Sequence, residues 1–101
     1  MFNLESLQNL KDKSADIQKK LTAITVEGKA GIEELTVTIC MNGRHEATKV
    51  TIDQALLQQP IQIICDLIAS AITDAAHKAE TAIQKETLKL LQNLKLPNLN
   101  K

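Results

Sequence analysis

The sequence predicts an α+β protein: a long N-terminal helix, a three-stranded antiparallel meander, a short helical turn and a long C-terminal helix. Three observations carry this prediction. Apolar residues recur at helical spacing over residues 4–24, they alternate with polar residues over 34–53, and no glycine or proline interrupts the chain between Pro60 and about Leu94. Steps of three and four residues indicate a helix face, whereas strict alternation indicates a strand with one buried face.

Length and composition favour a single domain with an aliphatic core. The chain has 101 residues, which is close to the commonest domain size, and Phe2 is its only aromatic residue. We expect residues 1–96 to form the domain and residues 97–101 to form a flexible tail. Twelve basic and twelve acidic side chains cancel, so the net charge does not indicate a nucleic-acid or membrane partner.

The first predicted helix has a narrow apolar stripe. Its apolar residues follow one another in steps of three and four, with Ser14 filling one position: Leu7, Leu10, Ile17, Leu21 and Ile24. Such a stripe is typical of a coiled-coil helix, so this helix is expected to pack against a partner helix.

The predicted meander has two turns. A β-like stretch begins at Thr22 and ends at Gly28, and "GKAG" (28–31) supplies turn residues. Asn42-Gly43 then predicts a two-residue type I′ hairpin turn, because both central positions of that turn need positive φ. This turn would place Met41 opposite Arg44, Val37 opposite Thr48 and Leu35 opposite Val50.

The C-terminal part is predicted to be almost entirely helical. Asp53 is placed to cap the short turn "QALLQQ", and Pro60 suits the first position of a helix. A helix from Pro60 to Leu94 would be roughly 50 Å long, whereas a compact domain of this size has a radius of gyration of about 13 Å. The helix must therefore extend beyond its own sheet.

An apolar stripe on such a helix needs covering by another subunit, most simply in a two-fold dimer. The candidate dimer-interface residues are Leu35, Val37, Ile39, Ile68, Ile72, Ala75 and Ala79.

The possible catalytic and metal-binding groups are weak candidates. The predicted hairpin makes Cys40 and His45 cross-strand neighbours, and such a pair can form an activated thiolate, but no residue is placed to orient the imidazole. His77 lies three residues from both Asp74 and Glu80, a pattern more typical of a solvated helix face than of a metal site. We therefore expect no catalytic residue, no metal, no cofactor and no small-molecule substrate.

Location is inferred from what the sequence lacks. The first residues have no signal-peptide pattern, and no apolar run approaches the roughly 18 residues of a membrane span. Cys40 and Cys65 lie inside apolar patterns and not at metal-ligand spacing. The expectation is a cytoplasmic protein with reduced thiols and no membrane partner.

Lysines on the two predicted helices leave two interpretations open. They are Lys11, Lys19 and Lys20 on the first helix and Lys78, Lys85 and Lys89 on the last. They form either an ordinary solvated face or a set of phosphate contacts to duplex DNA. In the second case binding would be largely independent of sequence, because base reading relies on arginine and Arg44 is the only one. The lack of Trp and Tyr argues against stacking on single strands.

In its order of motifs the chain resembles the YbaB/EbfC family of nucleoid-associated proteins. The similar segments are "VEGKAGIEELTVTICMNGRHEATKVTID" (26–53) and "DLIASAITDAAHKAET" (66–81). The resemblance implies a small bacterial homodimer in the nucleoid, with protruding helical arms whose lysines bind DNA.

Two positions depart from the family pattern, which has a glycine in place of Ala30 and consecutive basic residues where this chain has His77 and Lys78. Histidine is mostly neutral at pH 7, so the expected DNA binding is weak and salt-sensitive. The alternative function is a homodimeric protein-binding adaptor or chaperone, which the zero net charge and the acidic middle of the chain favour.

Overall fold

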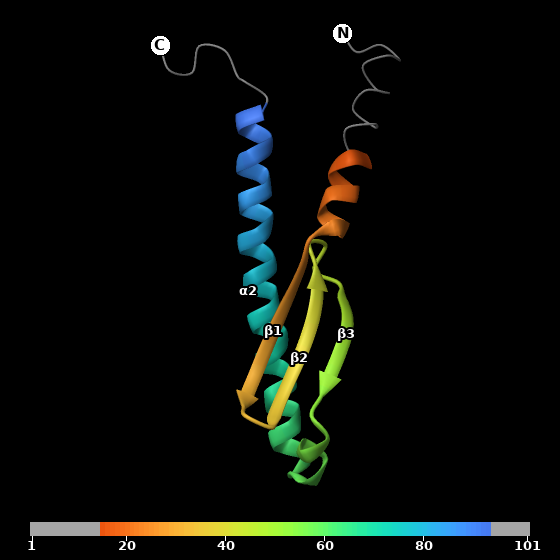
Figure 1. The fold of residues 1–101 in the computed structure, drawn as a ribbon, viewed down its shortest axis with the longest axis vertical. Helices are drawn as coiled ribbons and strands as arrows, with labels where there is room; N and C mark the ends of the chain where they lie inside the picture. The colour runs from red at the N-terminus through yellow and green to blue at the C-terminus, as the bar shows by residue number, and fades with distance from the viewer. Residues whose placement is uncertain (1–14, 94–101) are drawn as a thin grey trace.

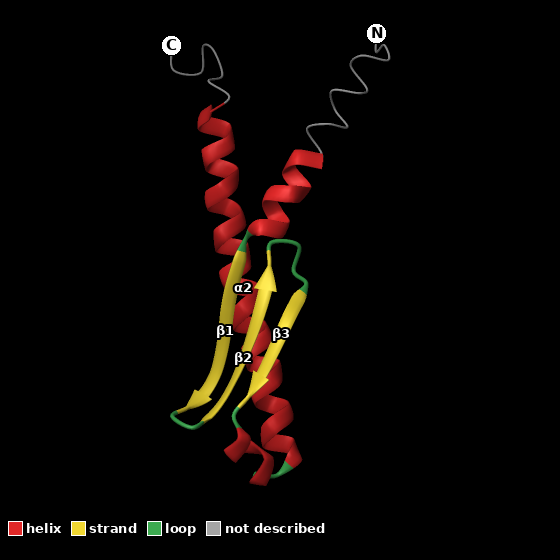
Figure 2. Cartoon of the chain, turned by 45° about the vertical axis from the view of Figure 1, so that its right-hand side comes forward, coloured by secondary structure: helices red, strands yellow, loops and turns green. Residues whose placement is uncertain are grey.

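The computed structural model describes residues 15–93, which form a three-stranded antiparallel sheet with a long helix packed on one face (Figures 1 and 2). This confirms the mixed α+β class and the predicted element order. The predicted Leu7, Leu10, Lys11 and the tail 97–101 lie outside the described residues. The elements are a helix at residues 15–23, β1 (Thr25–Ile32), β2 (Leu35–Asn42), β3 (Ala47–Ile52), the 3₁₀ helix η1 (Gln54–Gln58) and α2 (Ile61–Asn93).

Strand β1 continues through the segment that the sequence predicted to be a turn. Residues 28–31 pair with β2 from Ile39 to Thr36, and the chain reverses instead at Glu33 and Glu34. The prediction of a turn at "GKAG" is therefore wrong. Gly28 serves helix packing and not chain reversal, because a Cβ atom there would lie 2.3 Å from the Ala71 carbonyl oxygen and 2.3 Å from the Ala75 nitrogen.

The β2–β3 hairpin has a three-residue loop in place of the predicted two-residue turn. The Asn42 N–H donates to the Glu46 carbonyl at 3.0 Å, and the His45 N–H donates to the Asn42 carbonyl at 3.0 Å. His45 adopts the left-handed conformation with φ 61°. A turn followed by one left-handed residue is the usual form of a three-residue hairpin loop.

The side chain of Asn42 explains why the longer loop forms. Its Oδ1 accepts hydrogen bonds from the N–H groups of Arg44 and Glu46, and its Nδ2 donates to the Glu46 carboxylate at 2.9 Å. Asn42 is buried, so these bonds satisfy an amide that would otherwise be costly to remove from water.

The longer loop shifts the register of β3, and the predicted pairings of Met41, Val37 and Leu35 are wrong. Val37 pairs with Ile52 and Ile39 pairs with Val50. A bulge between Cys40 and Met41 compensates for the odd loop length. Val50 and Ile52 consequently stay on the predicted apolar face, opposite different partners.

Helix α2 packs closely on β1 and β2 because it presents alanines to the sheet. Small side chains let the helix backbone approach the strand backbone, and Gly28 lies at the point of closest contact. The core is aliphatic, as predicted. Its buried apolar residues are Val37, Ile39, Met41, Leu56, Ile64, Ala71, Ala75 and Ala79.

Asp53 joins the end of β3 to the start of β2. Its N–H donates to the Thr36 carbonyl at 3.0 Å, and its Oδ2 accepts from the Thr36 N–H at 3.0 Å. Asp53 precedes η1 as predicted, but its side chain makes no capping hydrogen bond to that helix. The adjacent Leu56 is fully buried beneath the sheet end.

Helix α2 extends well beyond the sheet, as its length predicted. It has 33 residues, or about 50 Å of helix, and the described protein measures 63 × 34 × 17 Å. Its distal part (residues 81–93) and the helix at residues 15–23 project from the same end of the sheet and diverge (Figures 1 and 2); we call them the two helical arms. No helix among residues 15–93 is both long and apolar enough to cross a membrane.

We predict that Gly28→Ala destabilises the protein by about 1–3 kcal/mol, the usual effect of overpacking a close contact. The new methyl group would overlap backbone atoms of Ala71 and Ala75, which cannot rotate away. Urea unfolding followed by circular dichroism measures the change. Lys29→Ala, an exposed position on the same strand, is the control and should alter stability by less than about 0.5 kcal/mol. Equal stability of the two variants would contradict the close-contact argument.

Candidate functional site

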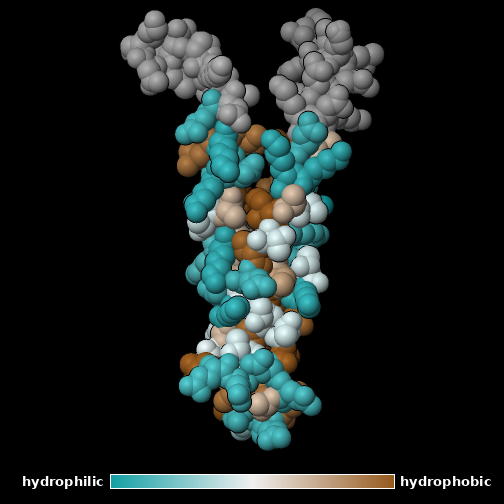
Figure 3. Space-filling view, in the orientation of Figure 1, coloured by the Kyte–Doolittle hydropathy of each residue, from teal (hydrophilic) through white to brown (hydrophobic). Residues whose placement is uncertain are grey.

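The helical arms carry four exposed lysines of the predicted set. Lys19 and Lys20 lie on the N-terminal arm, and Lys85 and Lys89 lie one helical turn apart on the α2 arm. No ion pair within residues 15–93 involves any of the four. Each described arm has one acidic residue against two lysines, Asp16 in the first and Glu86 in the second. Both arms therefore carry a small positive excess, and hydrophilic side chains make up much of their visible surface in Figure 3, with apolar side chains between them.

Lys78 has a different environment from the arm lysines. Its Nζ lies 2.9 Å from Asp74 Oδ2 and donates to the Glu27 carbonyl oxygen at 3.0 Å. Glu27 belongs to β1, so this lysine ties α2 to the outer edge of the sheet. We infer a structural role for Lys78, although its side chain is half exposed.

Asp74 completes the contact between α2 and the edge of β1. Its Oδ2 accepts a hydrogen bond from the backbone N–H of Lys29 at 2.9 Å. This bond and the neighbouring Lys78 ammonium lower the pKa of Asp74 from its ordinary value. Together Asp74 and Lys78 occupy one outward N–H and one outward C=O of β1, groups that an open strand edge would offer to another chain.

The β2–β3 loop fixes the base of both arms. The Gly43 N–H donates to the Leu21 carbonyl oxygen at 2.8 Å, at the end of the N-terminal helix. A Cβ at Gly43 would lie 2.5 Å from that same oxygen. On the other side of the loop, His45 Nε2 lies 3.4 Å from Glu80 Oε2 on α2. The sequence did not reveal this junction, because it depends on the left-handed His45 and the longer loop.

The expected Cys40–His45 neighbour pair is wrong. Cys40 lies opposite Lys49 and Glu27 on the two adjacent strands, and its Sγ is 3.9 Å from Glu27 Oε2. His45 lies in the loop beside Glu80. Within residues 15–93 no three His, Cys, Asp or Glu side chains are grouped so as to hold a metal ion.

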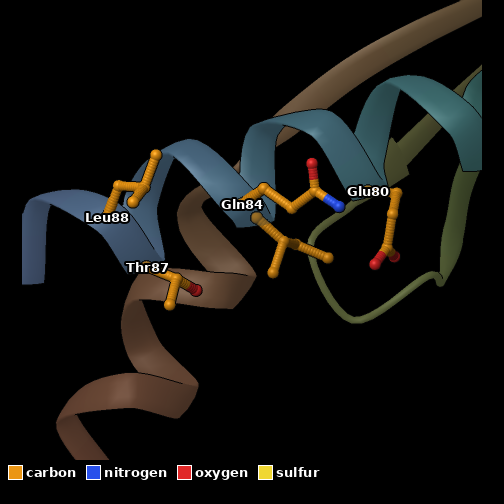
Figure 4. Close-up of a pocket in the computed structure, with 5 residues that line it drawn as sticks. Glu80, Gln84, Thr87 and Leu88 are labelled. Atoms are coloured by element: carbon orange, nitrogen blue, oxygen red, sulfur yellow. The ribbon is translucent and has the colours of Figure 1, made fainter. Parts of the chain in front are cut away.

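A shallow groove lies on α2 next to the N-terminal arm (Figure 4). Its volume is about 490 Å³, and it begins beside the His45–Glu80 contact. It offers two apolar side chains, one carboxylate, one amide and one hydroxyl. The lining residues are Glu80, Ile83, Gln84, Thr87 and Leu88.

The predicted dimer-interface residues divide into two groups. Val37, Ile39, Ala75 and Ala79 are at most 1% exposed within the single chain, so they form its own core. Leu35 and Ile68 are half-buried, and Ile72 is 42% exposed. Only the second group is accessible to a partner without opening the protomer.

Comparisons with known proteins agree with this architecture. The sequence profile of the YbaB/EbfC DNA-binding family matches residues 1–94. A nucleoid-associated protein of Legionella pneumophila (strain Corby) is 34% identical over 94 residues, which is 93% of this chain and 82% of the relative. A nucleoid-associated protein of Synechococcus sp. (strain JA-3-3Ab) is 31% identical over 96 residues, 95% of this chain and 85% of the relative.

The fold resembles a solved structure as well. The crystal structure of the uncharacterized protein HP0035 from Helicobacter pylori superposes with a TM-score of 0.66 at 20% identity, over 90% of this chain and 99% of that one. At this identity the likeness concerns the fold alone.

We predict that the stabilising effect of Asp74 depends on pH. The folded-state pKa of Asp74 is lowered, so its contribution is present above the ordinary pKa of about 3.9 and is lost as the pH falls through the folded value. Asp74→Asn should therefore lower the thermal midpoint at pH 7, and this difference should shrink as the pH falls below 4. Asp66→Asn, an exposed change on the same helix, is the control. A difference that stays constant down to pH 2.5 would contradict the ionic part of the contact.

Proposed function

The chain belongs to the YbaB/EbfC DNA-binding family, and we propose that it is a nucleoid-associated protein that binds duplex DNA through lysines on the helical arms of a homodimer. The contacts are to phosphate, so binding is largely independent of base sequence. The observation that carries this proposal is the placement of four exposed, unpaired lysines on the described arms of a member of a DNA-binding family. The similarity to nucleoid-associated proteins of bacteria supports the nucleoid, in the bacterial cytoplasm, as the location.

The chemistry of the arms suits backbone contacts. A lysine ammonium is a compact point charge on a flexible stem, which can reach a phosphate oxygen without a fixed geometry. Each contact releases condensed counterions, so binding weakens as salt rises. Because the chain has no net charge, long-range attraction is small, and affinity has to come from the local contacts of several lysines together.

Exposure and ion pairing support a smaller set of contacts than the six predicted lysines. We propose Lys19, Lys20, Lys85 and Lys89 as the phosphate-binding residues within the described part of the chain. Lys78 is assigned mainly to the β1 edge, because its ammonium is held by Asp74 and by the Glu27 carbonyl. Lys11 stays in the proposed set from its position on the predicted first helix. No catalytic step is part of this proposal.

A second candidate function is a protein-binding adaptor or chaperone. The groove on α2 favours it, since Ile83 and Leu88 line an open surface beside the N-terminal arm, and Leu88 is 59% exposed. An amphipathic helix of another protein is the kind of segment that fits such a surface. Stoichiometric recovery of a protein partner after nuclease treatment, with no DNA binding at low salt, would favour this candidate.

We predict that Lys85→Gln with Lys89→Gln weakens DNA binding and flattens its salt dependence. Removing two phosphate contacts per protomer should reduce the slope of log K against log salt by about 1.8 for each protomer that contacts the DNA, from about 0.9 per contact. Fluorescence anisotropy measures both effects. Two DNA duplexes of unrelated sequence are titrated with the protein at salt concentrations from low to physiological.

The matched control is Lys49→Gln, which neutralises an exposed lysine on β3 away from the arms. It should leave the slope unchanged. Absence of DNA binding by the unmodified protein at low salt would overturn the proposed function. An equal loss of DNA affinity in the control would indicate that the contact surface is on the sheet and not on the arms.

A further inference from the structure

We propose that DNA lies along the outer faces of the two helical arms, and that the groove on α2 stays free when DNA is bound. This inference rests on the proposed function, because it takes the arm lysines as the phosphate contacts, and it identifies which side of each arm meets the DNA. The outer face of the α2 arm is the side that carries Lys85 and Lys89, and the outer face of the N-terminal arm is the side that carries Lys19.

The contacts of α2 with the rest of the protein mark two sides of this helix. On one side, Lys78 Nζ donates to the Glu27 carbonyl oxygen at 3.0 Å, so this side lies at the β1 edge. On the other side, Glu80 Oε2 lies 3.4 Å from His45 Nε2 in the β2–β3 loop. Residues two positions apart on a helix differ by about 200° around its axis, so Lys78 and Glu80 point in nearly opposite directions.

The lysines of the α2 arm continue the side of Lys78. Lys85 comes seven residues after Lys78, and Lys89 comes eleven residues after it. Two turns of helix take about 7.2 residues and three turns take about 10.8, so both lysines lie within roughly 20° of Lys78 around the helix axis. The ammonium of Lys78 is held by the sheet, whereas Lys85 and Lys89 lie beyond the sheet and are exposed.

The groove continues the side of Glu80. Ile83 and Thr87 follow Glu80 by three and seven residues, and these three residues line the groove together with Gln84 and Leu88. This side of α2 faces the N-terminal arm (Figure 4). The arm lysines and the groove therefore occupy opposite sides of the same turns of α2.

The N-terminal arm has the same division. Of its helical residues 15–23, Leu21 alone is partly buried and the others are exposed. Leu21 therefore marks the inner side of this arm. Lys19 precedes Leu21 by two residues, or about 200° around the helix axis, so it points away from the inner side. Lys20 lies on the flank between them.

Charge and polarity favour the outer faces as the surface for a polyanion. The arm lysines make no ion pair within residues 15–93, so their ammonium groups are available to replace the counterions around DNA phosphates. The groove instead presents two apolar side chains and the carboxylate of Glu80. A phosphate placed in the groove would lose water without gaining a cationic partner from the groove lining, and the carboxylate would repel it.

The test compares two double variants that make α2 more negative by the same amount on opposite sides. Lys85→Gln with Lys89→Gln removes two positive charges from the outer face, and Gln84→Glu with Thr87→Glu adds two negative charges to the groove. Fluorescence anisotropy with a DNA duplex is measured at an ionic strength of about 0.1 M, where the screening length of about 10 Å is no larger than the helix diameter. We expect at least about a tenfold loss of affinity for the outer-face variant and less than about a threefold loss for the groove variant. Far-UV circular dichroism should show unchanged helix content, since all four positions are exposed.

A footprint of the unmodified protein gives a second measurement that does not depend on the folding of a variant. Lysines are acetylated with acetic anhydride in the presence and absence of the duplex, and the modified peptides are identified by mass spectrometry. DNA should protect Lys19, Lys85 and Lys89, and it should leave the reactivity of Lys49 on β3 unchanged. Equal protection of Lys49 and the arm lysines would contradict the proposal.

The anisotropy results also distinguish this inference from the proposed function. An equal loss of affinity in the two variants, a loss confined to the groove variant, or no loss in either variant would overturn the inference, because DNA would then contact the groove or a surface away from the α2 arm. In each of these cases the unmodified protein still binds DNA, so the family function stands. Absence of DNA binding by the unmodified protein at low salt would refute the proposed function, and this inference with it.

Discussion

The close contact between Gly28 and the alanine row of α2 determines the rest of this structure. A helix normally packs on a sheet through bulky side chains, but here Ala71 and Ala75 bring the helix backbone directly against β1. This contact fixes both the position and the rotation of α2. Rotation is the important consequence, because it directs Asp74 and Lys78 to the β1 edge and turns Ile68 and Ile72 to the other side.

The same contact divides the molecule into a closed side and an open side. Placing α2 over β1 and β2 buries Val37, Ile39 and Met41, yet leaves Val50 on β3 without a cover. A wider helix face would have covered β3 as well. The small alanines of α2 therefore leave the β3 side of this sheet face partly exposed to solvent.

The sequence predicted those features that depend on local periodicity and length. The order of elements, the face shared by Leu35, Val37 and Ile39, and the extension of α2 beyond the sheet all follow from spacing alone. The hairpin register does not follow from spacing. Asn42 satisfies its buried amide by hydrogen bonds to Arg44 and Glu46, and the resulting longer loop displaces β3. The role of Gly28 was missed for a related reason: a glycine in a strand and a glycine in a turn look the same until the packed helix is known.

The distribution of charge explains how a chain with no net charge can belong to a family of DNA-binding proteins. In the body, Asp74 with Lys78 and His45 with Glu80 are used to hold elements together. Among the described residues, Lys19, Lys20, Lys85 and Lys89 on the arms make no such ion pair, and Lys29 and Lys49 on the sheet make none either. A few phosphate contacts from one chain give weak binding, and the proposed homodimer would add a second set of contacts at a high effective concentration. Dimer formation would therefore raise DNA affinity without changing the zero net charge of the protein, because affinity then depends on how many arm lysines reach one duplex.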